Sequence, residues 1–167
     1  MSRIKKFSIS NQVDCKCVSC GSKSNLTLDH IFPKSKGGAN HPANYQILCF
    51  DCNQKKDSVI DSRIRIVDTV TVGHLVDRQY NKNLDIKTLC NILWSFFGKP
   101  LDNLQLITIA DMSKLDQYLS IYGIVPTTKP KVVKVAAEQS KKYMVKPDTK
   151  YQLSDITISK LVEMMGE

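Results

Sequence analysis

Two pairs of cysteines are the residues whose type and spacing most clearly indicate chemistry. Cys17-Val-Ser-Cys20 and Cys49-Phe-Asp-Cys52 are C-x2-C pairs, with residues 21–48 between them. Each pair can direct two thiolates at one tetrahedral Zn²⁺, and four thiolates close its coordination sphere, so we expect a structural zinc site. The competing interpretation, buried cysteines without a metal, fits paired C-x2-C motifs less well. Cys15 could replace Cys17, but Cys17 has the usual spacing to Cys20.

A second group of polar residues lies between the cysteine pairs and just after them. The segment 28–38 reads LDHIFPKSKGG, the segment 44–49 reads NYQILC, and the segment 52–57 reads CNQKKD. A histidine followed by amide side chains, with a carboxylate beside it, can supply a general base and oxygen ligands for a hard cation. These residue types in this order therefore indicate a candidate hydrolytic site.

The three motifs together resemble the HNH endonuclease family, which has a ββα-metal fold wrapped around a two-knuckle zinc site. The resemblance covers about residues 15–60, and all three motifs agree with it in order and spacing. It places His30, Asn44 and Asn53 at the three positions that name the family, so the chain resembles an HNN variant. It also implies that Asn44 holds the loop of His30 through a hydrogen bond to the backbone.

The chemistry expected of such a site can be argued from the residues. Hydrolysis of a phosphodiester needs a base for water and a cation that neutralises charge in the transition state. His30 is the candidate base because imidazole titrates close to neutral pH. Asp29 and Asn53 would supply two oxygen ligands for one Mg²⁺ or Mn²⁺. Because neighbours on a strand point to opposite faces, we expect one of Asp29 and His30 to leave the strand at a turn.

Basic residues close to these motifs could bind the phosphates that flank a scissile bond. The four candidates are Lys34, Lys36, Lys55 and Lys56. The chain has two other histidines. We expect His41, in a loop beside Pro42, to be exposed to solvent and not a ligand, and nothing near His74 indicates a role.

Charge and composition favour a polyanionic partner. The chain has 167 residues with 24 Lys and Arg against 16 Asp and Glu, a formal charge of +8. Two stretches, 1–60 and 129–150, each carry about +5 of this charge. Double-stranded DNA is the expected partner. No apolar run is long enough to span a bilayer, so we expect a cytoplasmic protein whose cysteines are reduced and free for metal.

The elements that must position these residues indicate an α+β fold. In 1–60, short strands are expected at 26–28 and 45–48, a loop at 36–38, and a helix from about Asp51 past Lys56, forming a zinc-bound HNH nuclease module. The region 61–128 should be a mostly helical domain. Asp85 can cap a helix that ends at Gly98, and Asp111 can open another that ends at Gly123.

The rest of the chain has weaker signals. Alternating and helical patterns compete in 59–72, and neither is favoured. The lysine-bearing stretch 129–150 is expected to be an extended basic linker or arm, with contact to DNA slightly favoured over a solvated linker. A short helix should follow in 151–167.

Two functions remain as hypotheses. The first is a metal-dependent DNA endonuclease of phage or homing type, with 61–167 supplying target recognition; because one motif copy cuts one strand at a time, a homodimer would be needed for a double-strand break. The second is a non-catalytic zinc module that binds nucleic acid. Intact Asp29, His30, Asn44 and Asn53 favour the first, since a binding module has no need of all four.

Overall fold

The computed structural model describes residues 15–147, and the chain divides into two compact units. The first unit ends at Val67 and includes the later segment Lys134–Ser140, while the second contains Asp68–Val133 and the chain from Lys141 onward. Both units contain helices and strands, so the expected α+β class is confirmed. None of the described helices is long and apolar enough to cross a membrane.

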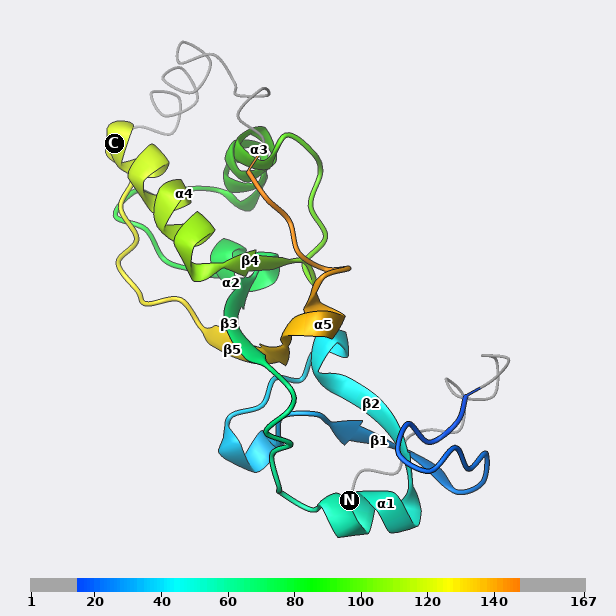
Figure 1. Ribbon diagram of the computed structural model, residues 1–167. Helices are drawn as coiled ribbons and strands as arrows, with labels where there is room; N and C mark the ends of the chain where they lie inside the picture. Colours follow the sequence, from blue (N-terminus) through cyan, green and yellow to red (C-terminus); the bar gives the residue numbers. More distant parts are fainter. Residues whose placement is uncertain (1–14, 148–167) are drawn as a thin grey trace. The chain divides into compact units, whose positions relative to one another are not determined.

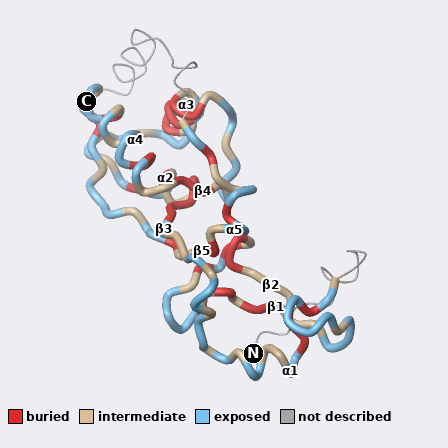
Figure 2. Tube along the Cα trace, in the orientation of Figure 1, coloured by how far each residue is buried: buried red, intermediate tan, exposed pale blue. Residues whose placement is uncertain are grey.

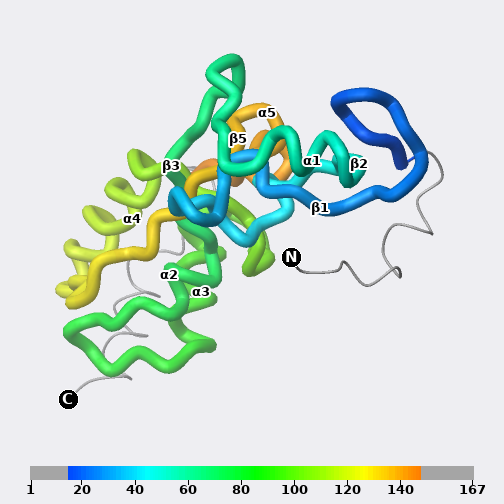
Figure 3. Tube along the Cα trace, turned by 90° about the horizontal axis from the view of Figure 1, so that it is seen from below, coloured from blue at the N-terminus to red at the C-terminus, as the bar shows by residue number. Residues whose placement is uncertain are grey.

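The first unit is built on a hairpin and one helix in the order ββα. Strand β1 (Leu26–His30) pairs antiparallel with β2 (Tyr45–Cys49), and the register runs from Leu26 opposite Cys49 to His30 opposite Tyr45. Helix α1 (Phe50–Lys56) begins directly after β2 and contacts both strands, and the three elements lie together in Figures 1 and 3. Two strands alone are only marginally stable, so helix α1 is needed to complete this small unit.

The connection between β1 and β2 is a compact loop rather than a simple turn. It contains two short 3-10 helices, η1 (Lys34–Lys36) and η2 (Pro42–Asn44). Gly37 has φ of 90° and ends η1, as the expected loop at 36–38 requires. Gly38 lies so close to Phe32 that an added Cβ would overlap the Phe32 carbonyl, so only glycine fits there.

A distant segment of the chain braces this loop. Strand β5 (Val132–Ala136) is followed by helix α5 (Ala137–Ser140), and α5 packs on η2. The Ala39 N–H donates to the carbonyl of Lys134, and Gly38 bridges to the same residue. The expectation of an extended arm over 129–150 is therefore wrong for 132–140. Val133 and Val135 are buried on alternate positions of β5. Their burial offsets the conformational entropy that this lysine-rich segment loses when it becomes ordered.

A three-stranded sheet has the strand order β4-β3-β5. Strand β3 (Ile66–Thr71) lies in the centre and pairs antiparallel with β4 (Leu106–Thr108). The ambiguous stretch 59–72 thus forms a strand, because residues 69–71 are buried by tertiary packing that no local pattern could reveal. A short helix, α2 (Val72–Val76), follows directly, with the Thr71 hydroxyl accepting from the N–H of His74 as its cap.

Two longer helices cover the apolar core of the second unit. Helix α3 (Ile86–Phe97) begins at the Asp85 cap and ends at Gly98, where φ is 73°, as the sequence predicts. Helix α4 (Ile109–Ile121) starts earlier than expected because Thr108, not Asp111, caps it. Figure 2 shows the buried residues, in red, along β4 and α3. The helix expected in 151–167 lies outside the described residues.

Candidate active site and metal centre

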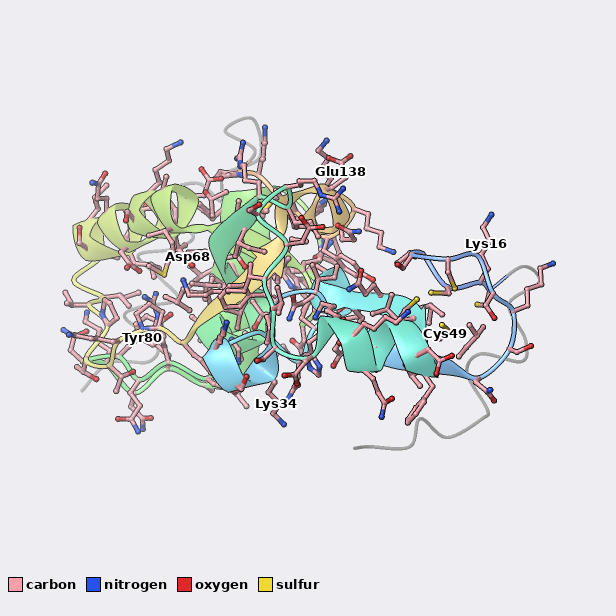
Figure 4. The ribbon with its side chains drawn as sticks, turned by 60° about the horizontal axis from the view of Figure 1, so that its bottom comes forward. Lys16, Lys34, Cys49, Asp68, Tyr80 and Glu138 are labelled. Atoms are coloured by element: carbon pink, nitrogen blue, oxygen red, sulfur yellow. The ribbon has the colours of Figure 1, made fainter. Side chains whose placement is uncertain are left out.

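The four cysteines of the two C-x2-C pairs come together in one cluster. The sulfur atoms of Cys17, Cys20, Cys49 and Cys52 all lie within 4.8 Å of one another. Those of Cys20 and Cys49 are 3.6 Å apart, close to the separation of two thiolates on one tetrahedral Zn²⁺. Figure 4 shows yellow sulfur atoms gathered near the labelled Cys49. Cys17, rather than Cys15, is the cysteine that joins the other three in this cluster.

Local backbone structure delivers each pair of thiols. The N–H of Gly21, at φ of 77°, bonds the Cys17 carbonyl and closes a tight turn that carries the first pair. Cys49 ends β2 and Cys52 lies in the first turn of α1, so the strand-to-helix junction carries the second pair. Packing of β2 against the tight turn that carries Cys17 and Cys20 therefore fixes the cluster. The apolar residues that surround the cluster include Leu48 and Leu26.

The electrostatics of the cluster suit a cation. Burial acts to raise the pKa of Cys17, but backbone N–H groups of Cys49, Cys20 and Ser19 outweigh it and lower the pKa to about 6. The Ser19 side chain acts to lower the pKa of Cys52, but the sulfurs of Cys49 and Cys20 raise it to about 12. Four thiols this close together cannot all lose their protons in the absence of a cation, whereas a divalent cation would stabilise the four thiolates together. The donor set fits zinc.

His30 is the last residue of β1, and two neighbours orient its ring. Its Nε2 lies 2.8 Å from Oδ1 of Asn40, in the loop that follows η1. The Tyr45 ring, opposite His30 on β2, meets the imidazole edge to face with centroids 5.1 Å apart. The imidazole is partly exposed, so a water molecule and a substrate could reach it.

Asp29 precedes His30 and is almost buried, at 9% exposure. Its Oδ2 accepts from the Gln46 amide at 2.8 Å and lies 3.0 Å from the Lys56 ammonium on α1. Gln46 is opposite Asp29, and Tyr45 is opposite His30, so the two candidate residues use opposite faces of the hairpin. The expected turn between them is wrong: both residues belong to β1, because the ladder continues to the last pair.

Asn44 is fully buried and fastens the loop that follows His30. Its Oδ1 accepts from the Phe32 N–H at 2.9 Å, while its Nδ2 donates to the carbonyls of Phe32 and Ala39 at 3.0 Å. The Asn44 carbonyl also accepts from the N–H of Ile31. One side chain therefore ties together both ends of the segment 32–39.

Asn53 lies on the face of α1 that meets β1. Its Nδ2 donates to the Thr27 hydroxyl at 2.9 Å, and that hydroxyl donates to the carbonyl of Leu48. Thr27 and Asp29 share one face of β1, and Lys56 follows Asn53 by nearly one helical turn. Asn53 and Lys56 thus make two adjacent contacts between α1 and β1.

Comparison with known families decides what this segment is. Residues 17–66 match the family model described as HNH endonuclease. This segment is similar to HNH endonuclease domains, and residues 17–66 are called the HNH domain below. No curated protein and no solved structure matches the chain. The HNH match covers both cysteine pairs and all of Asp29, His30, Asn44 and Asn53, and the family acts on nucleic acid.

The lysines of the HNH domain occupy different environments. Lys34, Lys36 and Lys55 are exposed, and Figure 4 shows Lys34 extending from its short helix. Lys56 instead holds Asp29, and its ammonium also donates to the His30 carbonyl at 2.9 Å. His41 is buried at 2% exposure, so its expected exposure is wrong. Its Nδ1 accepts from the N–H of Ala43 and caps η2, a role that depends on the folded loop.

Three features of the HNH domain escaped the sequence analysis. Asn40 and Gln46 contact the candidate base and carboxylate, but an isolated amide has no distinctive signal in a sequence. The pairing of the two expected strands could have indicated that Gln46 contacts Asp29, because the antiparallel register places these two residues opposite each other. The return of residues 134–140 to the His30 loop depends on contacts about a hundred residues apart in the chain, which local patterns do not encode.

Proposed function

We propose that this protein is a metal-dependent DNA endonuclease that hydrolyses phosphodiester bonds. The observation that carries the proposal is the placement of a partly exposed His30 at the end of β1, with Asn44 fastening the loop that follows it. A general base needs a fixed position and access to water, and this arrangement supports both. The HNH family match over residues 17–66 supports the same reaction class.

His30 would act as the base in the reaction. Neutral imidazole takes one proton from water while the water oxygen forms a bond to phosphorus. The bond between phosphorus and the leaving sugar oxygen breaks, and that oxygen takes a proton from solvent. Asn44 contributes by holding the loop, so that the imidazole does not have to be ordered when substrate binds.

Asp29 and Asn53 are the residues that would hold a divalent Mg²⁺ or Mn²⁺. The Asp29 carboxylate makes both of its polar contacts through Oδ2, and the Asn53 amide donates its hydrogen bond through Nδ2. Oδ1 of each residue therefore accepts no hydrogen bond from the described part of the chain, and oxygen donors suit a hard cation. Bound there, the cation would neutralise charge that develops on the phosphate. Nearby Lys56 adds positive charge on the same side.

The proposal extends to the setting of the reaction. Exposed lysines beside the site, with the formal charge of +8, support duplex DNA, in which the phosphate density is high, as the nucleic acid. A homodimer would place two copies of the site on the two strands. We place the enzyme in the cytoplasm, where thiols stay reduced for zinc, and in a phage or homing-type role.

Incubation of the purified protein with supercoiled plasmid tests the activity. Cleavage with Mg²⁺ or Mn²⁺ and none with EDTA is expected, and open-circle against linear product reports nicking against double-strand cutting. His30→Ala should lower the rate roughly a hundredfold to ten-thousandfold. His74→Ala, which removes a histidine of the other unit, should cut at the parental rate.

The alternative function, a non-catalytic zinc module, makes a different prediction in the same experiment. Such a protein would retard DNA in a gel and leave the plasmid supercoiled with every metal. Cleavage that persists unchanged in His30→Ala would indicate a contaminating nuclease and would also contradict the proposal. Asp29→Ala and Asn53→Ala should be partly rescued by higher Mn²⁺, whereas His30→Ala should not.

A further inference from the structure

The contact between His30 and Asn40 carries information about the proton on the imidazole. Nε2 of His30 lies 2.8 Å from Oδ1 of Asn40. An amide oxygen can accept a hydrogen bond but cannot donate one. Nε2 must therefore carry the proton of the neutral ring, which leaves the lone pair on Nδ1.

The position of Asn40 is fixed although its side chain is exposed. The residue before it, Ala39, is buried, with its N–H bonded to Lys134 and its carbonyl accepting from Asn44. The residue after it, His41, is buried and caps η2. The backbone is thus held on both sides of Asn40, so its amide meets the imidazole with little loss of entropy.

We propose that Asn40 is the positioning residue of His30: it orients the ring and keeps the proton on Nε2, so that Nδ1 is the nitrogen that takes the proton from water. This inference rests on the proposed function of His30 as a base. Asn40 itself does not touch the reacting atoms. Tyr45 supports the ring from β2 without a hydrogen bond to it, so it can limit the tilt of the ring but cannot choose the tautomer.

Charged and titratable groups surround His30 on three elements. Tyr45 lies on β2, Lys56 approaches the His30 carbonyl from α1, and Asp29 precedes it on β1. Burial raises the pKa of Tyr45, so it stays neutral near pH 7. Lys56 and Asp29 pair with each other, and their charges largely offset at the ring.

Nitrogen-15 NMR of the imidazoles tests the tautomer without any need for cleavage. The zinc-loaded full chain has three histidines, and His30→Gln identifies the signals of His30. Above pH 8 the parental protein should show a protonated Nε2 and an unprotonated Nδ1 at His30. In Asn40→Ala the signals should move toward those of a tautomer mixture. A protonated Nδ1 in the parental protein, or unchanged signals in Asn40→Ala, would overturn the assignment.

Kinetics test whether the orientation matters to the reaction. Asn40→Ala should lower kcat about tenfold to a hundredfold with KM nearly unchanged, because the base is misplaced but not removed. Ser35→Ala, an exposed change in the same loop, is the control and should match the parental enzyme.

The two readouts separate the inference from the function on which it rests. A parental protein that cuts no DNA but shows the Nε2 proton would refute the endonuclease and leave the Asn40 contact established. A parental protein that cuts DNA, with Asn40→Ala retaining its kcat, would refute the role of Asn40. Unchanged zinc content and circular dichroism of each variant would show that the fold is intact.

Discussion

The Lys56 ammonium on α1 lies 3.0 Å from Oδ2 of Asp29 on β1, with both side chains mostly shielded from solvent. Their exposed fractions are 16% and 10%. A charge pair in such a position is screened less than one at the surface, and removal of one partner leaves the other partly buried. The pair also joins the helix to the strand that carries His30, since Lys56 donates to the His30 carbonyl.

Lys56→Met is therefore expected to destabilise the first unit by about 1–3 kcal/mol, less than a fully buried pair would cost. Lys55→Met removes the same charge from an exposed position on the same helix, and it should change the free energy of unfolding by less than about 0.5 kcal/mol. Denaturant titration of the zinc-loaded protein measures both. Equal effects of the two substitutions would show that the Asp29 contact contributes nothing.

Zinc should hold the first unit together. Structural zinc contributes on the order of 10–16 kcal/mol in small modules, and the cysteine cluster has only a small apolar surround of its own. Cys52→Ala should therefore lose zinc and the β1–β2 structure, whereas Cys90→Ala, outside the cluster, should keep both. Elemental analysis and circular dichroism report the two quantities. A parental protein without one equivalent of zinc would contradict the assignment.

Two adjacent glycines should respond differently to alanine. At Gly38 an added Cβ would overlap the carbonyl of Phe32 and lie 2.7 Å from its carbon, so the loop must shift and break the contacts of Asn44. Gly37→Ala meets no atom within 4 Å and should cost only the strain of a positive φ, about 1–2 kcal/mol. We expect the Gly38 variant alone to lose cleavage. Comparable activity of both variants would mean that the loop adapts.

Exposed lysines near His30 should contribute to the salt dependence of DNA binding. Each phosphate contact contributes about 0.9 to the slope of log affinity against log salt. The double change Lys34→Gln and Lys36→Gln should therefore reduce the slope by up to about 1.8. Lys87→Gln with Lys99→Gln removes equal charge from exposed positions in the second unit and is the control. Identical slopes for the two double variants would indicate that η1 does not contact DNA.

The cap of α3 should make the stability of the second unit depend on pH. The Thr88 N–H donates to Asp85 at 2.7 Å and holds the pKa of this carboxyl below its ordinary value of 3.8. A depressed folded-state pKa stabilises the fold above the unfolded value and loses that effect as pH falls through the folded value. Asp85→Asn should thus lower the thermal midpoint at pH 7, and the difference from the parental protein should shrink below pH 3.8.

Asp77→Asn, at an exposed position of the same unit, provides the comparison for this experiment. Its difference from the parental midpoint should be small and should not follow the same pH window. A gap between Asp85→Asn and the parental protein that stays constant from pH 7 to pH 2 would contradict the assigned role of the carboxylate.

Local signals in the sequence were sufficient for the cysteine cluster, the hairpin, and helix α3. The C-x2-C spacing places two thiols at a separation that suits one metal ion. Asp85 and Gly98 mark the two ends of α3 through interactions with residues only a few positions away. The motif residues of the HNH domain were likewise readable, because their order along the chain follows the ββα sequence of elements.

Only the tertiary structure decided which side chains support those motifs. Asn40 reaches His30 because Ala39 and His41 are held by packing, and β5 is a strand rather than an extended arm because Val133 and Val135 are buried. The sequence by itself determined the residues whose chemistry is intrinsic or whose partners are near in the chain. Partners far apart in the chain are chosen by burial, and burial is a property of the whole fold.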